Sequence, residues 1–429
     1  MSHPPTKQDP YIAWRTPDFR CFELSWFAMT FSKQIERLAI AVYFVNLYSS
    51  SDAALALAMM GLVQAAPIML LAIFGGQLAD RFDRRRLWID TLVVNVVVSI
   101  GLIAAVWHNS SPVWIYVLLA LNATAQSVGS PSRAALLPQL VSREAFTNAV
   151  TWNSTMFYMG SVTGPAIGGA ILAVWHNPAS ALVAVAVWRL VALLAVWRIR
   201  HRQAVGDGQE ISWESVVAGI RFVWKTKLIL ASITLDMFAV LLGGVTYLLP
   251  IFAKDILHVG PLGLGFLQGA DAIGATCMAV MLVHLPPMRR AGVTLLWAVA
   301  GFGLATILFG VSTWFWFSMA MMFLVGALDN ISVVVRHTLV QMLTPDEMRG
   351  RVSAVNNVFI VASNDLGGLE SGLTTWLFGS AMLSAVFGGV GTMLVVVTVA
   401  CLWPEILRIG SLQSICPVMI ESEDETPNL

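Results

Sequence analysis

Charged residues are scarce in this chain of 429 residues, in which Asp, Glu, Lys and Arg together make up 12%. Soluble domains carry about 25%, so a chain with 57% hydrophobic residues and so few charges is not a soluble globular domain. The 25 acidic and 25 basic side chains give a formal net charge of zero, which offers nucleic acid no basic surface. Together with a mean hydropathy of +0.74, these shortages predict a membrane-embedded protein.

Cysteine is also rare, and its pattern excludes several kinds of site. The four cysteines are scattered and form no CxxC pair, so they predict no metal or redox site. The apolar stretches hold no H-E-x-x-H motif and no nucleophile beside a base. We therefore expect no enzyme, no metal and no cofactor. The N-terminus, MSHPPTKQDP, lacks the basic and apolar regions of a cleavable signal, so the first apolar segment is expected to remain as an anchor.

Long apolar runs occupy most of the chain. A spanning helix needs about 20 mostly apolar residues. Twelve stretches fit: 20–48, 54–79, 87–107, 111–130, 147–173, 178–199, 226–252, 262–285, 291–311, 313–336, 351–378 and 381–404. Basic residues gather in the connections after spans 2, 4, 6, 8 and 10, whereas Lys254 is the one basic residue in the connections after odd-numbered spans. Because cytoplasmic loops retain Lys and Arg, we predict a multi-pass protein of the plasma membrane (the inner membrane of a Gram-negative cell) with both termini cytoplasmic.

The chain repeats itself with a shift of 203 residues. In this register Arg133 meets Arg336, Asn153 meets Asn356, Gly164 meets Gly367 and Gly169 meets Gly372. We therefore predict an all-α membrane protein of twelve transmembrane helices in two pseudo-symmetric six-helix bundles, an arrangement typical of secondary transporters. The predicted divisions are a first bundle at 1–199, a cytoplasmic linker at 200–225, a second bundle at 226–405 and an acidic cytoplasmic tail at 406–429.

The linker contains an amphipathic segment, ISWESVVAGIRFVWK, in which Trp213, Val216, Val217, Ile220 and Trp224 share one helical face. This spacing fits a helix at the membrane interface. It fits equally a helix that packs on the bundle.

A charged loop, GGQLADRFDRRRL, separates spans 2 and 3. It resembles the loop signature of the major facilitator superfamily, matched by Gly76, Asp80, Arg81, Arg84 and Arg85. Asp83 stands where the signature has a second glycine, although Asp also favours turns. The resemblance implies the major facilitator fold, with a loop that stabilises the state closed on the cytoplasmic side. The alternative is a basic cluster that serves orientation alone.

The fifth span carries a second motif, GSVTGPAIGG. It resembles the G-x-x-x-G-P-x-x-G-G pattern of drug and proton antiporters through Gly160, Gly164, Pro165, Gly168 and Gly169. Small residues permit close helix packing and proline bends a helix, so we interpret the motif as a hinge and seal on the extracellular half. The alternative is an ordinary packing face. With the loop motif, the resemblance covers about the first eleven spans and is similar to the branch of enterobactin exporters and macrolide-efflux proteins.

Ionisable residues inside spans are costly, at about 2.5–3.5 kcal/mol each at the bilayer centre, so each is a functional candidate. Our candidates for a substrate or proton pathway are Lys33, Glu36, Arg37, Asp236, Asp271 and Asp329. Lys33, Glu36 and Arg37 share a helical face and could instead neutralise one another. The register places Lys33 on Asp236 and Gln126 on Asp329. From this asymmetry we expect Lys33 or Arg37 to face Asp236 across a cavity and Asp329 to exchange protons, unless Asp329 is a surface neighbour of Arg336.

These features predict a monomeric secondary transporter in contact with membrane lipids. It exports a small amphiphilic compound (a drug, siderophore or secondary metabolite) by alternating access, driven by protons. One alternative is a lipid or lysolipid flippase on the same fold, favoured if the cavity opens sideways to the bilayer. The other is a non-transporting receptor or assembly protein, against which the two intact motifs argue.

The loop motif generates the first test. A carboxylate at Asp80 could meet the positive N-terminus of the eleventh span near Arg351, a contact that contributes about 0.3–2 kcal/mol. We expect Asp80→Asn to leave expression near normal and to raise cysteine accessibility at the cytoplasmic side. Unchanged labelling together with unchanged transport would rule this latch out.

Overall fold

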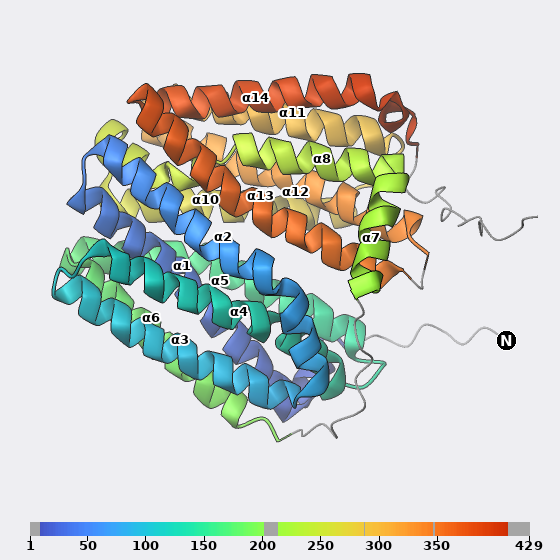
Figure 1. Cartoon of the computed structure of the whole chain (residues 1–429), viewed down its shortest axis with the longest axis horizontal. Helices are drawn as coiled ribbons and strands as arrows, with labels where there is room; N and C mark the ends of the chain where they lie inside the picture. Colours follow the sequence, from blue (N-terminus) through green and yellow to red (C-terminus); the bar gives the residue numbers. More distant parts are fainter. Residues whose placement is uncertain (1–8, 201–212, 287, 346–347, 411–429) are drawn as a thin grey trace, which may run out of the picture.

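The computed structural model describes residues 9–200, 213–286, 288–345 and 348–410, without the side chains of 72–81, 213–216, 354, 357 and 361. Throughout these residues the regular structure is helical. Long helices lie side by side in two groups, an N-terminal half and a C-terminal half (Figure 1). The fold class predicted from the sequence is confirmed. Parts of the predicted linker (201–212) and tail (411–429) lie outside the described residues.

Six long helices form the N-terminal half. They are α1 (Pro17–Leu47), α2 (Ser50–Arg81), α3 (Arg84–Trp107), α4 (Pro112–Leu140), α5 (Phe146–Trp175) and α6 (Pro178–Trp197), preceded by a short turn of 3₁₀-helix, η1 (Ala13–Arg15). The amphipathic segment forms α7 (Trp213–Lys225).

The C-terminal half begins with a broken span. Its pieces are α8 (Lys227–Leu242), η2 (Val245–Tyr247), α9 (Leu249–Ile251) and η3 (Phe252–Ile256). The five spans that follow are α10 (Gly260–His284), α11 (Ala291–Gly310), α12 (Phe315–Leu343), α13 (Arg349–Phe378) and α14 (Ala381–Leu402), and a short η4 (Pro404–Arg408) ends the described chain.

Ten helices in the described residues are long and apolar enough to cross a membrane. The other two of the twelve predicted spans are α1 and α13. They are long enough, with 31 and 30 residues, but both carry ionisable side chains along their length, which lowers their hydropathy. Helix ends follow the predicted spans closely except for α4, which ends at Leu140 rather than 130, and α12, which ends at Leu343 rather than 336. Both longer helices continue past an arginine, Arg133 or Arg336, that ends the apolar run in sequence but packs inside the bundle.

The repeat is visible in how equivalent helices end and begin. His176 ends α5 in the left-handed conformation (φ 54°), and Gly379, 203 residues later, ends α13 in the same conformation (φ 64°). The next residues, Asn177 and Ser380, cap α6 and α14 by accepting hydrogen bonds from Ala179 N (2.9 Å) and Leu383 N (3.4 Å). Such side-chain caps satisfy backbone donors that a helix leaves free at its start.

The two halves meet along two helix pairs, α2 with α13 and α5 with α10. A Cβ added at Gly169 on α5 would lie 2.6 Å from the Pro261 carbonyl oxygen on α10. A Cβ added at the repeat partner, Gly372 on α13, would lie 2.4 Å from Ala58 Cβ on α2. Ala58 and Pro261 are themselves 203 residues apart, so the repeat builds two equivalent interfaces that only glycine permits.

Both glycine contacts lie toward one end of the molecule, which carries the connections after α1, α3 and α5 and which we call the arginine-poor end. The opposite, arginine-rich end carries the connections after α2, α4 and α6. At the arginine-poor end Lys254 Nζ donates to the Val45 carbonyl (2.5 Å), and Ser50 Oγ donates to Asp255 Oδ2 (2.6 Å). These bonds join the halves directly.

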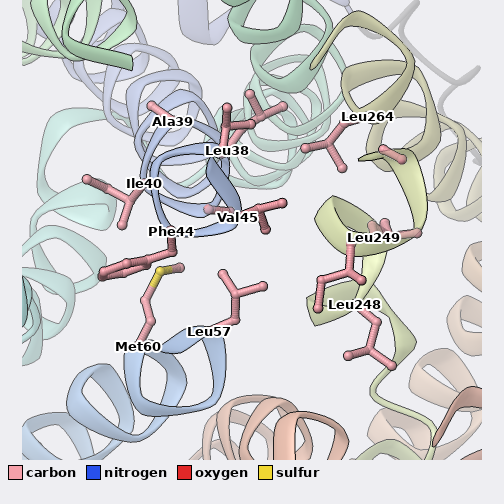
Figure 2. Close-up of a cluster of buried hydrophobic side chains, with 14 of the residues drawn as sticks. Leu38, Ala39, Ile40, Phe44, Val45, Leu57, Met60, Leu248, Leu249 and Leu264 are labelled. Carbon is pink, nitrogen blue, oxygen red and sulfur yellow. The ribbon is translucent and has the colours of Figure 1, made fainter. Parts of the chain in front are cut away.

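Among the side chains that the structure describes, the buried apolar ones form three clusters. The largest lies at the arginine-poor end and contains residues of both halves, such as Leu38 and Leu57 from one and Leu249 and Leu264 from the other. Figure 2 shows side chains of α1 and α2 opposite those of α9 and α10. The other two clusters lie toward the arginine-rich end, and each contains residues of one half only, together with α7 in the C-terminal case. One end of the molecule therefore has a shared core, and the other has a separate core for each half.

α7 crosses the ends of α8 and α13 (Figure 1). Phe222 and Val223 are buried in the C-terminal core, whereas Val217, Ile220 and Trp224 are exposed, Trp224 by 67%. The helix thus combines the two expected arrangements: one side packs on the bundle, and the apolar face described from Val217 to Trp224 points away from it. The side chains of Trp213 and Val216 lie outside the described residues.

The glycine contact between the halves gives a test with a matched control. We expect Gly169→Ala to push α5 from α10 at the arginine-poor end, at a cost of about 1–3 kcal/mol, and so to favour the state closed at the arginine-rich end. Gly168→Ala should leave the distribution unchanged, because its Cβ would lie 3.4 Å from its nearest neighbours, on Ile35 within the same half. Spin-label distances across each end measure the two populations. Equal behaviour of the two variants would contradict a role for this contact.

Candidate functional site

The charged loop lies at the arginine-rich end, between α2 and α3. Asp83 caps α3 by accepting from Arg86 N (2.9 Å), so the residue that departs from the family signature provides the helix start. Arg84 donates to the Ala135 carbonyl (3.2 Å) and Arg85 to the Trp197 carbonyl (2.6 Å) at the end of α6. Trp197 ends α6, and carbonyls at helix C-termini carry partial negative charge, which suits Arg85. The side chains of Asp80 and Arg81, and Gly76, lie in the part of α2 outside the described side chains.

The glycine motif of α5 faces two different helices. A Cβ at Gly160 would lie 3.0 Å from Thr30 and one at Gly164 2.8 Å from Gln34, both on α1, and Gly168 faces Ile35 of the same helix. Pro165 and Gly169 face α10 instead, where a Cβ at Gly265 would lie 2.4 Å from the Pro165 carbonyl oxygen. One face of the motif therefore packs α5 against α1 of its own half, and the adjacent face packs it against α10 of the other half.

Glu36 of α1 is buried and paired with Arg189 of α6, at 2.8 Å. Asn122 donates to the second carboxylate oxygen (2.8 Å), and Arg189 also donates to Ser99 Oγ (2.8 Å) and the Asn95 carbonyl (3.2 Å). Four helices thus share one polar network. The alternative that Lys33, Glu36 and Arg37 neutralise one another does not hold for Glu36, because its partner is Arg189 of α6.

Lys33 and Arg37 lie on the side of α1 toward the C-terminal half. Lys33 Nζ donates to Gln126 Oε1 (3.2 Å), and its side chain is exposed although α1 lies inside the bundle. The Arg37 guanidinium lies 4.3 Å from the centre of the Tyr247 ring, and Tyr247 Oη donates to Asp365 Oδ1 (2.7 Å). Lys33 and Arg37 are one turn apart on the same helical face, so both cations lie on the side of α1 that meets the C-terminal half.

Asp236 differs from the expectation that it faces Lys33 or Arg37. The partner of Asp236 is Arg336 of α12, in a buried ion pair within the C-terminal half, and Ser332 also donates to it (3.4 Å). The physical reason is the repeat itself. Lys33 contacts Gln126 inside its own half, and Asp236 likewise contacts its own half at Ser332, one turn after Asp329, the position equivalent to Gln126.

Asp271 and Asp329 form no hydrogen bond or ion pair with the residues that the structure describes. Both are half-buried. A Cβ added at Gly326 of α12 would lie 2.0 Å from the Asp271 backbone carbonyl oxygen and 2.8 Å from Asp271 Oδ1, so glycine at this position lets the backbone of α10 pack against α12 and places the Asp271 carboxylate beside it. Asp329 lies three residues after Gly326, on the same helical face. Arg336 lies two turns after Asp329 on α12, and Asp236 engages it in an ion pair.

Several polar residues were not predicted from the sequence. Tyr247 and Asn122 stand alone in apolar runs and gave no motif. Glu23 is fully buried near the start of α1 and accepts from Asn153 Nδ2 (3.2 Å). Asn153 also accepts from Arg133 (3.4 Å), whose guanidinium lies 3.5 Å from the Trp26 ring centre. The sequence feature that could have indicated this cluster is the repeat, because it aligns Arg133 with Arg336, which is also buried beside an acidic residue.

The pair in the C-terminal half gives a test. Asp236→Asn leaves Arg336 buried without its carboxylate, at a cost of about 3–5 kcal/mol, so we expect lower thermal stability in detergent. Adding Arg336→Gln should restore part of the loss, because no uncompensated charge then remains. Lys33→Gln added to Asp236→Asn is the matched control and should restore nothing. Rescue by Lys33→Gln instead would contradict the pairing described here.

Comparisons with known proteins agree with this arrangement. A family model described as Major Facilitator Superfamily matches residues 24–368. "Enterobactin exporter EntS" from Shigella dysenteriae serotype 1 is 27% identical over 328 residues, which is 75% of this chain and 73% of the relative. The protein of the same name from Escherichia coli O1:K1 has the same identity and coverage.

Solved structures show the same fold. A peptide transporter POT matches with a TM-score of 0.71 at 14% identity, over 94% of this chain and 100% of that one. A bacterial homologue of the human lysosomal transporter Spinster, in an inward-facing and unoccupied conformation, matches with a TM-score of 0.67 at 14% identity, over 91% and 97%. The chain is thus a multi-pass membrane transporter that belongs to the major facilitator superfamily.

Proposed function

We propose that this protein is a proton-coupled exporter of a small amphiphilic compound, working by alternating access. The observation that carries the proposal is the distribution of buried apolar clusters. The halves share one cluster at the arginine-poor end and have separate clusters toward the arginine-rich end. Two rigid bundles joined at one end only are what rocking around a central site requires.

The charge distribution supports the direction of opening. Since Lys and Arg are retained in cytoplasmic loops, the arginine-rich end is assigned to the cytoplasm, with both termini there and the protein in the plasma membrane, or the inner membrane of a Gram-negative cell. The structure then corresponds to a state closed toward the outside. A compound for export would enter this state from the cytoplasm, and the names of the relatives at 27% identity, enterobactin exporters, favour export.

The unpaired carboxylates support proton coupling. Of the acidic candidates, Glu36 and Asp236 have arginine partners, whereas Asp271 and Asp329 have none within the described chain. A carboxylate beside other carboxylates in a half-buried site is disposed to take up a proton when the solvent around it changes. Asp329 has two such neighbours, Asp236 and Asp271, and is our assignment for the proton site.

The amphiphilic character of the substrate rests on the same region. Lys33 and Arg37 on one side and Asp271 and Asp329 on the other provide charges of both signs, among apolar helices. The slot between α5, α10 and α12 described below does open to the bilayer, as a flippase requires, but it has only apolar side chains. A flippase would also need a polar path there for the lipid headgroup. An exporter is therefore favoured over the lipid-transport alternative. We propose a monomer as the functional unit, because each half supplies one wall of the pathway.

Transport into inside-out vesicles tests the proposal. Enterobactin, a macrolide and a lipophilic dye serve as chemically distinct probes, each measured with and without an imposed acidic lumen. We expect gradient-dependent accumulation of at least one probe, absent from vesicles without the protein. Failure of all three, together with movement of a labelled lysolipid in the same vesicles, would favour the flippase.

Asp329 gives the corresponding mutational test. We expect Asp329→Asn to transport down a concentration gradient yet to show no stimulation by the proton gradient, because the amide cannot bind and release a proton. Asp52→Asn is the control: Asp52 is exposed at the arginine-poor end, accepts from Ser49 (2.8 Å) and should retain the wild-type response. A full response in Asp329→Asn would remove Asp329 from the coupling mechanism.

A further inference from the structure

An apolar slot of about 730 Å³ lies between α5, α10 and α12. This volume is within the range of about 300–1,000 Å³ found for small-molecule sites. Val162 and Ala166 of the N-terminal half form one wall, and α10 and α12 of the C-terminal half form the other. Every lining side chain is apolar, and polar surface is nearly absent from the slot. It therefore suits hydrocarbon and repels water or a charged group.

The slot opens toward the bilayer. Four of its lining residues, Phe266, Ile273, Trp316 and Leu324, are 47%, 42%, 60% and 41% exposed. In the most apolar 18-residue stretch of α10, only 22% is buried inside the protein. This is the lowest share among the ten candidate spans in the described chain. Ile273 lies midway along α10, and exposed apolar surface at that depth of a spanning helix faces lipid chains, so the material at the mouth of the slot is hydrocarbon.

The slot also continues the interface between the halves. α5 and α10 are in tight contact at Gly265, where a Cβ would lie 2.4 Å from the Pro165 carbonyl oxygen. One turn later, at Gly269, a Cβ would lie 3.6 Å from its nearest neighbour, the Val162 carbonyl oxygen. The two helices therefore diverge from the arginine-poor end, and the slot occupies the space where they separate.

We propose that this slot binds an acyl chain of a bilayer lipid, and that the bound chain stabilises the state closed at the arginine-poor end. The chain fills space between the two halves that exists because α5 and α10 diverge. Rocking to the opposite state would bring these helices together at this depth and expel the chain. A ligand that binds one of two states shifts the population toward that state, so the conformational equilibrium depends on how well the surrounding chains fit.

Photocrosslinking tests the site. The wild-type protein is placed in phosphatidylcholine and phosphatidylethanolamine vesicles in which some lipids carry a diazirine at mid-chain. We expect adducts concentrated on peptides 266–273 and 316–324. Gly269→Leu should reduce these adducts to background, because its Cβ would meet the Val162 carbonyl oxygen only at an ordinary van der Waals distance of 3.6 Å and the rest of the side chain can occupy the slot. Ala320→Phe should do the same from an exposed position on α12.

Ala104→Leu is the matched control, since Ala104 is exposed on α3 outside the slot and should leave the adducts unchanged. An even spread of adducts over all membrane-facing helices, or adducts unaffected by both filling variants, would overturn the site. Loss of the adducts on adding an exported compound would assign the slot to that compound instead of lipid.

The conformational part has its own readout, independent of transport. Spin-label distances across the arginine-rich end are compared in lipids with straight chains and in lipids with branched phytanoyl chains, which fit the slot poorly. We expect the wild-type protein to shift toward the state closed at that end in branched lipids, and Gly269→Leu to show no lipid-dependent shift. Equal shifts in both proteins, or none in either, would overturn the proposed stabilisation. Failure of the export proposal would leave these outcomes untouched.

Discussion

Close packing at glycine between the two halves is the constraint on which the rest of the structure depends. Between membrane helices there is little hydrophobic driving force, and association relies on van der Waals contact at small residues. Here Gly169 against Pro261 and Gly372 against Ala58 bring the halves together twice, at equivalent positions of the repeat. The shared apolar core and the cross-half hydrogen bonds of Lys254 and Ser50 lie at the same end. The contacts between the halves are thus concentrated at that end, and at the other end each half has its own core.

Charge inside the bundle is managed separately by each half. In the N-terminal half Arg189 neutralises Glu36, and in the C-terminal half Arg336 neutralises Asp236. Neither pair crosses between the halves, so neither has to break when the halves rock. The contact of Arg37 with Tyr247 does cross, but a cation over an aromatic ring contributes only about 0.5–2 kcal/mol. The buried ion pairs therefore stay within a rigid body, and what must be remade in each cycle is the Arg37 contact, the hydrogen bonds of Lys254 and Ser50, and the apolar packing that the halves share.

Local sequence patterns predicted the spans and their symmetry. They did not predict which side chains pair between helices, because that depends on how each helix is rotated about its axis. Apolar runs and loop arginines predicted the twelve spans, and the 203-residue register predicted the symmetry that His176 and Gly379 display at equivalent helix ends. The register also suggested that Lys33 faces Asp236, which was wrong because a twofold repeat relates contacts within each half. The partnership of Glu36 with Arg189 could not be predicted, since it depends on which face α6 presents to α1. Tyr247 carried no signal, because one tyrosine in an apolar run resembles any other.

Divergence between the repeats assigns different tasks to the halves. The positions of Glu36 and Arg189 are occupied in the second half by Ala239 and Thr392, and there a single hydrogen bond from the threonine hydroxyl to the Ala239 carbonyl (3.1 Å) replaces the ion pair. The second half places its own buried ion pair elsewhere, at Asp236 and Arg336, next to Asp329. In the first half the matching site holds Lys33 and Gln126, which cannot supply a carboxylate. Under the proposed proton coupling, the carboxylate that takes up the proton belongs to the C-terminal half, and the N-terminal half provides the basic side chains on the opposite side.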